Sequence, residues 1–246
     1  MEIVLNNVSS FPLHSINVTL IPGITALVGK DSNRLIDVIT GKRSYKGSIN
    51  ISSKEVFLVK KDLDKSFLMP RVKSYLNFIF RYYEQKVEDE KIQNTLKDLS
   101  LEENFLDKKT NNLSSSEELL LQFIVGICLD RNILILEEPF IYLDTLTEKR
   151  IIKYLNKLKK DKIIIIATEN ANKIYDYCDK ALILKDYTVL AYDDTKNIYE
   201  NCKYLKQESL NVPDTVLFTT KARNKNIKLK FHKDVRDLIK DVYKHV

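Results

Sequence analysis

Glycine is scarce in this chain of 246 residues, which contains only 5 glycines and no tryptophan. Average usage of about 7% would supply roughly 17 glycines in a chain of this length. Hydrophobic residues make up 44% of the chain and charged residues 30%, which are ordinary values for a folded domain. The composition therefore excludes an intrinsically disordered, collagen-like or coiled-coil protein.

Cysteine and histidine are also few. The three cysteines, Cys128, Cys178 and Cys202, are too far apart for the close spacing of a disulfide framework or zinc site, which is typical of a protein from the reducing cytosol. We expect them to be ordinary thiols of the core or surface. The three histidines are too scattered to indicate a metal site or a catalytic triad.

No hydrophobic run approaches the roughly 18 to 20 residues that a membrane span requires. The longest, around Ile163–Ala167, has the length of a strand. The first residues are acidic and then strand-like, without the basic and apolar segments of a signal peptide, so none is expected.

Short apolar segments separated by polar, proline or glycine residues dominate the first sixty positions and predict strands. Residues 62 to 112 then change to a helical pattern, with apolar residues at helical spacing from Val72 to Tyr83. The strands are expected at Ile3–Val8, Ile16–Leu20, Ile24–Val28, Ser48–Ile51 and Glu55–Val59, with a short helix at Leu35–Ile39.

From Ser114 onward, apolar strands alternate with helices, which is typical of a buried parallel sheet. The predicted helices are Glu117–Leu129, Leu146–Leu158 and Ala171–Tyr177, and the predicted strands are Ile133–Leu136, Ile163–Ala167, Ala181–Leu184 and Thr188–Ala191. The fold class is therefore α/β, with a β-rich N-terminal part, a helical insertion and a parallel-sheet core.

The last part of the chain, from Tyr199, holds 11 Lys and Arg against 6 Asp and Glu, so it carries most of the net charge of +6. Strands are predicted here at Val216–Phe218 and Ile227–Phe231, followed by a closing amphipathic helix. We expect two domains, residues 1–198 and a basic C-terminal extension over residues 199–246.

The segment ILILEEPFIYLD, from Ile133 to Asp144, is the strongest functional motif. An apolar strand ends in two carboxylates, Glu137 and Glu138, at the edge where parallel sheets bind ligands. In a nucleotide-hydrolysing site, the first would orient magnesium and the second the attacking water. The alternative is an ordinary strand with solvated glutamates at its end.

This segment resembles the Walker B motif and D-loop of ATP-binding-cassette transporter ATPases, with Asp144 as the D-loop aspartate. Around it, LIPGITALVGKDSNRLIDVITG (Leu20 to Gly41) is similar to the family's strand, P-loop and helix, and NNLSSSEELL (Asn111 to Leu120) to its signature motif. Val72–Leu76 and IIIIATEN (Ile163 to Asn170) fall where the helical subdomain and the switch histidine belong. The resemblance covers about residues 1 to 195 and implies a P-loop NTPase-like cassette fold.

The P-loop departs from the family's GxxxxGK[ST] pattern, whose backbone and lysine hold the phosphates of ATP. The segment GKDSNRL is about three residues shorter, and Asp31 adds a negative charge where phosphate would lie. The resemblance places the degenerate loop on Gly29, Lys30, Ser32, Asn33 and Arg34.

Other positions also differ from the family's motifs, independently of the P-loop. Glu137 stands for the magnesium-binding aspartate, Glu169 for the switch histidine, and Lys60 or Lys61 for the Q-loop glutamine. Glu138 matches the catalytic carboxylate, and Phe11 could replace the aromatic residue that stacks on adenine. Solvated surface residues are the alternative interpretation of Lys60, Lys61 and Glu169.

The signature motif retains Ser114, but Ser115 and Ser116 replace its glycines and Glu117 its glutamine. Because paired cassettes dimerise head to tail in this family, the motif would serve the nucleotide of the partner, and Ser114 is the residue expected to keep that role, helped by the helix dipole. Ser115 and Ser116 crowd the close approach that glycine would permit. The carboxylates of Glu117 and Glu118 oppose that role.

The resemblance implies a catalytically degenerate subunit of a bacterial transporter on the cytoplasmic face of the membrane. Its expected partners are an active ATPase subunit in a heterodimer and transmembrane permease subunits, contacted through residues 70 to 99. ATP and Mg²⁺ would be held by the partner more than by this chain. Peptide or antimicrobial export or resistance is expected by analogy alone.

Two alternatives remain open. One is a divergent but active ATPase that uses Lys30 and Glu138. The other is an adaptor outside transport, whose basic tail (Lys221–Lys230, Lys233 and Arg236) binds an acidic surface. Nucleic acid is not expected, because RNA-binding aromatic motifs and glycine-rich loops are missing.

Overall fold

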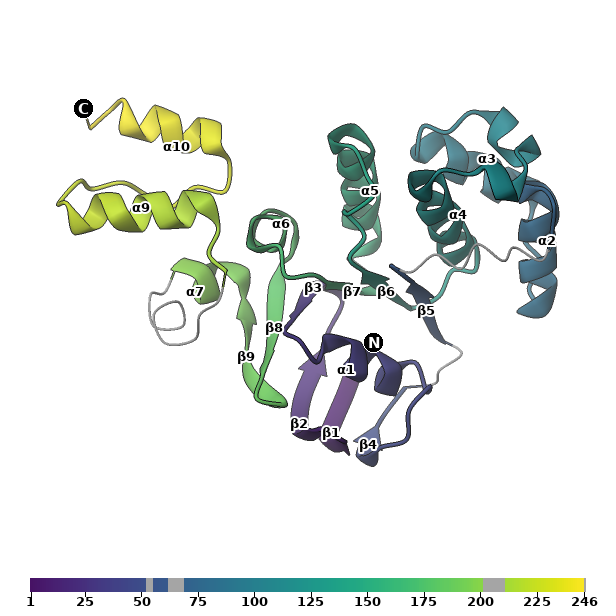
Figure 1. Cartoon of the computed structure of the whole chain (residues 1–246), viewed down its shortest axis with the longest axis horizontal. Helices are drawn as coiled ribbons and strands as arrows, with labels where there is room; N and C mark the ends of the chain where they lie inside the picture. The colour runs from purple at the N-terminus through teal and green to yellow at the C-terminus, as the bar shows by residue number, and fades with distance from the viewer. Residues whose placement is uncertain (52–54, 62–68, 201–210, 246) are drawn as a thin grey trace.

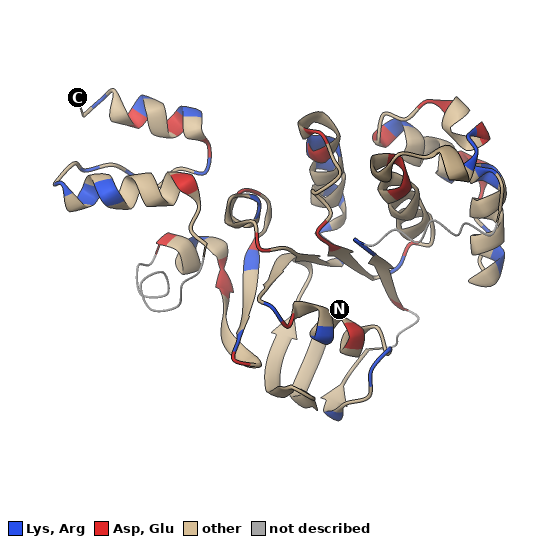
Figure 2. Cartoon of the chain, in the orientation of Figure 1, with Lys and Arg blue, Asp and Glu red and all other residues tan. Residues whose placement is uncertain are grey.

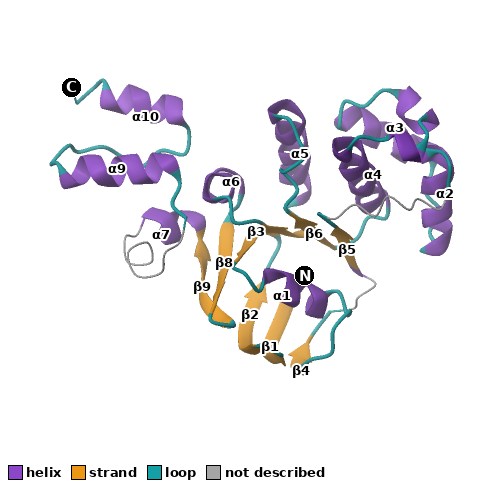
Figure 3. Cartoon of the chain, viewed as in Figure 1, coloured by secondary structure: helices purple, strands orange, loops and turns teal. Residues whose placement is uncertain are grey.

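The computed structural model describes residues 1–51, 55–61, 69–200 and 211–245. Two sheets and the helices packed on them form the body of the molecule (Figures 1 and 3). The smaller sheet is antiparallel, in the order β2-β1-β4, and comprises β1 (Ile3–Ser10), β2 (Leu13–Leu20) and β4 (Lys46–Ile49). The β-rich N-terminal part is thus confirmed.

The larger sheet has the order β5-β6-β7-β3-β8-β9 and is parallel except for its last strand. Its strands are β3 (Gly23–Val28), β5 (Val56–Val59), β6 (Ile133–Glu137), β7 (Ile163–Ala167), β8 (Lys180–Lys185) and β9 (Thr188–Asp194). This parallel core was expected from the near-continuous apolar character of its strands.

Both faces of the larger sheet are covered, as that apolar character requires. Ile133 and Ile135 of β6 join the core shared with α1 (Ser32–Ile39) and the smaller sheet. Leu134 and Leu136 instead face a second core formed with α4 (Ser115–Cys128), α5 (Thr145–Leu158) and α6 (Ala171–Tyr177). Alternate residues of one strand therefore bind the two layers together.

The predicted helical segment after β5 is confirmed over the described residues. It contains α2 (Val72–Tyr82), α3 (Asp89–Asp98) and the short 3-10 helices η2 (Glu103–Asp107) and η3 (Thr110–Asn112). These helices pack beside α4, at the end of the molecule opposite the C-terminus (Figure 1). Leu76, Phe80 and Leu96 carry their apolar faces into the core.

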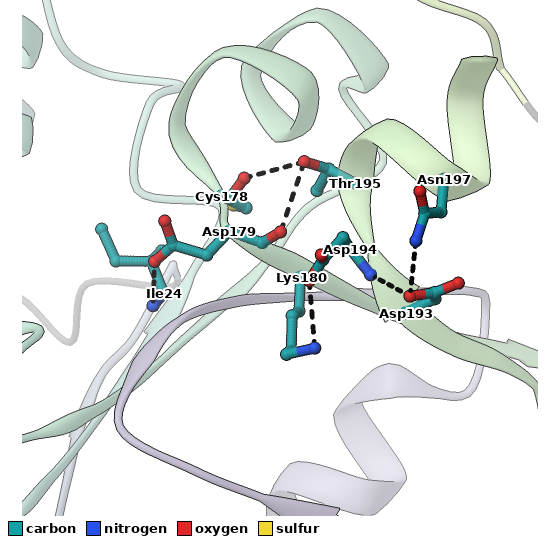
Figure 4. A network of polar contacts seen from close by, with 8 residues as sticks. All are labelled: Ile24, Cys178, Asp179, Lys180, Asp193, Asp194, Thr195 and Asn197. Atoms are coloured by element: carbon teal, nitrogen blue, oxygen red, sulfur yellow. Dashed lines mark hydrogen bonds and ion pairs between the residues drawn. The ribbon is translucent and has the colours of Figure 1, made fainter.

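A polar network fastens the edge of the larger sheet (Figure 4). The carboxylate of Asp179 accepts a hydrogen bond of 3.0 Å from the backbone N–H of Ile24, which joins β8 to the start of β3. The buried hydroxyl of Thr195 donates to the carbonyl oxygen of Cys178 at 3.0 Å. The start of the C-terminal region is thereby held to the central strands.

The C-terminal region is helical, with α7 (Thr195–Glu200), α9 (Asp214–Asn224) and α10 (Val235–Val242). The closing amphipathic helix is confirmed, but both strand predictions are wrong. Val216–Phe218 lies inside α9, and 227–231 belongs to the connection between α9 and α10. Runs of three to five apolar residues are short enough for either a strand or a helix. In α9, the buried residues Thr215, Thr219 and Ala222 recur at helical spacing.

Two of the three cysteines lie in the core. Cys128 and Cys178 are buried and free, and burial raises the pKa of both thiols. Both are the core thiols that the sequence predicts, whereas Cys202 lies outside the described residues. Among the described helices, none is both long and apolar enough to cross a membrane.

Candidate nucleotide site

Three loops that resemble nucleotide-binding motifs follow adjacent strands. β6, β7 and β3 are neighbours in the sheet and run parallel, so their carboxyl ends share one edge. This edge carries Glu137 at the end of β6 and Glu138 directly after it, Glu169 after β7 and the loop at Gly29 after β3. The sheet therefore places the three motifs where α/β proteins bind ligands.

The loop between β3 and α1 is only three residues long, from Gly29 to Asp31. The backbone N–H of Ser32 donates to the carbonyl oxygen of Gly29 at 3.0 Å, and that of Arg34 to Asp31 at 3.0 Å. The guanidinium of Arg34 also lies 3.5 Å from the carboxylate of Asp31. Two of the N–H groups at the position of the phosphate cradle, those of Ser32 and Arg34, are thus engaged inside the turn.

Gly29 is explained by packing. Its φ is +124°, and a Cβ at this position would lie 2.3 Å from the backbone oxygen of Leu184 in β8. Glycine is therefore required for the close approach of the loop to the neighbouring strand.

A pocket of about 480 Å³ opens beside this loop. Its charged walls comprise Lys30, Asp31, Glu169, Lys185 and Asp186, so three carboxylates face two ammonium groups. Such a wall disfavours a polyphosphate. The remaining lining consists of Val28, Gly29, Leu184, Tyr187, Tyr199 and Asn211. It is not lined by Ser32, Asn33, Arg34, Glu137 or Glu138.

Glu138 is bound to the neighbouring loop. Its Oε2 accepts a hydrogen bond from the hydroxyl of Thr168 at 2.8 Å, and its Oε1 accepts one from the backbone N–H of Glu169 at 3.3 Å. Its own N–H donates to the carbonyl oxygen of Ala167, and its φ is +42°. These contacts tie the end of β6 to the end of β7.

The other positions are solvated or engaged elsewhere. Glu137 is half-buried, and Glu169, Lys60 and Lys61 are exposed. The backbone N–H of Lys60 donates to the side-chain oxygen of Gln122 at 3.0 Å. Within the described ranges, no group of three or more His, Cys, Asp or Glu side chains is placed to hold a metal ion.

Phe11 is 91% exposed in the turn between β1 and β2. It lines a shallow hollow with His14, Tyr45 and Tyr187. Because Tyr187 also lines the pocket beside Gly29, this hollow and that pocket adjoin one another.

The N-terminus of α4 is closed by its own carboxylate. Ser114 is the N-cap residue, and its Oγ accepts a hydrogen bond from the N–H of Glu117 at 3.3 Å. In return, Oε2 of Glu117 accepts from the N–H of Ser114 at 3.0 Å and from its hydroxyl at 3.1 Å. This capping box engages the hydroxyl and N–H of Ser114 and the N–H of Glu117, at the helix end where the signature motif would meet phosphate.

Lys108 completes this arrangement by an ion pair with the other oxygen of Glu117. Burial raises the pKa of Glu117, but hydrogen bonds from Lys108 and Ser114 outweigh it and hold the pKa below its ordinary value of 4.5. Ser115 and Ser116 begin the helix and are half-buried.

The depressed pKa of Glu117 predicts a pH-dependent contribution to stability. The stabilisation is present above pH 4.5 and is lost as the pH falls through the lower pKa of the folded state. Glu117→Gln should therefore lower the free energy of unfolding at neutral pH, and its difference from the wild type should shrink in acid. Urea titrations between neutral and acid pH measure this difference. Glu90→Gln, which changes another first-turn carboxylate, is the control.

Asp144 caps α5. Its Oδ1 accepts hydrogen bonds from the N–H groups of Leu146 and Thr147 at 2.8 and 3.0 Å, and its Oδ2 accepts one from the Thr147 hydroxyl at 2.7 Å. The hydrogen bonds from Thr147 are the main reason that the pKa of Asp144 is lowered. Its carboxylate is thus also engaged within the chain.

Sequence reasoning missed three residues that organise this edge. Thr168 anchors Glu138, Gln122 holds the end of β5, and buried Glu148 joins α5 to α6. Only Thr168 could have been found from the sequence, because it stands directly before Glu169, at the switch-histidine position. The other two act through tertiary contacts.

Comparison with known proteins agrees with this architecture. The energy-coupling factor transporter ATP-binding protein EcfA3 of Oenococcus oeni is 24% identical, over 65% of this chain and 57% of the relative, so this chain spans little more than half of that protein. The phosphate import ATP-binding protein PstB 2 of Streptococcus pyogenes is 27% identical over 73% of this chain and 78% of the relative. No family model matches the sequence.

Solved structures share the fold. The cbiO1 protein of Clostridium perfringens, described as part of the ABC transporter complex cbiONQ, superposes with a TM-score of 0.69 at 20% identity, covering 89% of this chain and 98% of that one. An ATP-binding subunit of an ABC transporter gives a TM-score of 0.72 at 17% identity, covering 80% and 92%. The fold is therefore that of an ATP-binding-cassette ATPase. The chain is a homologue of ABC transporter ATP-binding subunits, which confirms the resemblance seen in the sequence.

Proposed function

We propose that this chain is a non-hydrolysing cassette subunit of a membrane ABC transporter, which pairs with an ATP-hydrolysing cassette. It would lie on the cytoplasmic face of the membrane, bound to permease subunits through its helical region, residues 70 to 99. Its role would be mechanical, because closure of the cassette pair would be transmitted to the permease.

One observation carries this proposal. At each of the three motifs that would face phosphate, groups of the motif are hydrogen-bonded to other residues of this chain. The P-loop turn bonds to itself, Glu138 bonds to Thr168 and Glu169, and the α4 N-terminus bonds to Glu117. These residues do not fit MgATP, so it would be bound mainly by the partner. Residues 1–198 would form the cassette and residues 199–246 the extension.

The transported substrate is not assigned. The relatives are named for energy-coupling-factor transport and phosphate import, and they give no support for peptide or antimicrobial export. Export or resistance therefore remains a prediction by analogy.

Purification of the tagged chain from detergent-solubilised native membranes tests the proposal. We expect a second cassette with an intact GxxxxGK[ST] loop and a membrane-spanning subunit in stoichiometric amounts. Recovery of the chain with a permease but without a second cassette would favour the divergent active ATPase. Recovery of neither, with acidic partners bound to the basic tail, would favour the adaptor.

A further inference from the structure

The two C-terminal helices leave a large apolar face uncovered. Phe218 of α9 is 50% exposed and Tyr243 of α10 is 80% exposed. These residues line a groove of about 590 Å³ between α9 and α10, together with Asp214, Thr215, Val235, Leu238, Ile239 and Val242. The hairpin's own core contains only Ala222, Leu229 and Leu238 as buried residues. An exposed apolar face beside so small a core is typical of an interaction surface.

The exposed face of α9 has a charge pattern that complements itself. Asp214, Leu217, Phe218 and Lys221 are exposed at i, i+3, i+4 and i+7, so they form one stripe along the helix. A negative charge stands at one end of the stripe, a positive charge at the other and two apolar residues at its centre. If a second copy lies antiparallel across it, Asp214 faces Lys221 of that copy and Leu217 faces Phe218.

The charges on α10 do not favour a different partner. Arg236 pairs with Asp234 at 2.6 Å, and Lys240 pairs with Asp237 at 2.9 Å. These cations beside the groove are thus already balanced inside the chain, although the tail as a whole is basic (Figure 2). α10 itself therefore offers no excess charge to an acidic protein or an anionic bilayer.

We propose that the α9–α10 face binds the same face of a second copy of this chain, with α9 packed antiparallel on α9 about a two-fold axis. Leu217 and Phe218 of each copy would then enter the groove of the other. The face lies at the end of the molecule opposite α2 and α3 (Figure 1), so this contact would leave the helical region free. The inference does not depend on whether the chain hydrolyses ATP.

Sedimentation velocity of the full chain at micromolar concentrations without nucleotide tests this proposal. We expect a reversible dimer. Lys221→Asp should weaken it by about tenfold or more, because two like-charge contacts then arise per dimer. Asp214→Lys should do the same.

The double variant Asp214→Lys with Lys221→Asp should restore the dimer, because each new charge again faces its opposite. Asn172→Ala is the matched control. It removes the hydrogen bond of 2.9 Å that the Asn172 amide donates to the Asp214 carboxylate and the bond of 2.8 Å that it accepts from the Asp214 N–H, without changing a residue of the stripe. It should leave the dimer unchanged. A monomeric wild type would overturn the proposal, as would a dimer that is insensitive to single charge reversal or is not rescued by the double variant.

Discussion

Replacing Glu148 with alanine is expected to lower the free energy of unfolding by about 3 kcal/mol, because one partner of a buried ion pair is removed. Glu148 lies in the first turn of α5, is almost fully buried and pairs with Lys173 of α6. Tyr177 of α6 also donates a hydrogen bond to this carboxylate. We expect the low end of the usual range, since Lys173 is partly exposed and can turn toward water.

Chemical denaturation followed by circular dichroism measures this effect. Lys149→Ala is the control, because it changes the exposed neighbouring residue and should alter stability by less than about 0.5 kcal/mol. Equal effects of the two substitutions would show that the cluster does not join α5 to α6.

Gly29→Ala is also expected to destabilise the fold by about 3 kcal/mol or more. The substitution combines left-handed backbone strain with a collision, since the new Cβ would lie 2.3 Å from the backbone oxygen of Leu184. The loss should appear as a lower midpoint of thermal unfolding.

Gly23→Ala separates the two causes. Gly23 also has a positive φ, +140°, but its nearest contact would be an ordinary 3.5 Å to Asp179. We expect a smaller loss, of about 1–2 kcal/mol from strain alone. If Gly29→Ala were the milder of the two, the packing explanation for Gly29 would be wrong.

The parallel core could be predicted because each strand shows its environment locally. Ile163–Ala167 is apolar at every position, and an apolar run of this length predicts a strand that is buried on both faces. The tail could not be predicted in this way. Val216–Phe218 is short enough for either structure, and helical packing against the rest of the chain decided it.

The location of the site residues could be predicted from the sequence, but most of their hydrogen-bond partners could not. The motifs show which residues reach the edge of the sheet, because adjacent parallel strands end there. They do not show that Glu138 bonds to Thr168, since these residues are 30 positions apart. The capping box at Ser114 could have been found, because Ser and Glu stand at its spacing of three residues.

Calorimetric titration of the purified chain with ATP and Mg²⁺ tests the central claim most directly. The N–H groups of Ser32 and Arg34 bond to carbonyl oxygens inside the turn that starts at Gly29, so on our proposal we expect no saturable heat in the micromolar range. The S. pyogenes phosphate import ATP-binding protein, titrated under the same conditions, is the positive control. Micromolar binding by this chain, accompanied by release of phosphate, would contradict the account and identify an active ATPase.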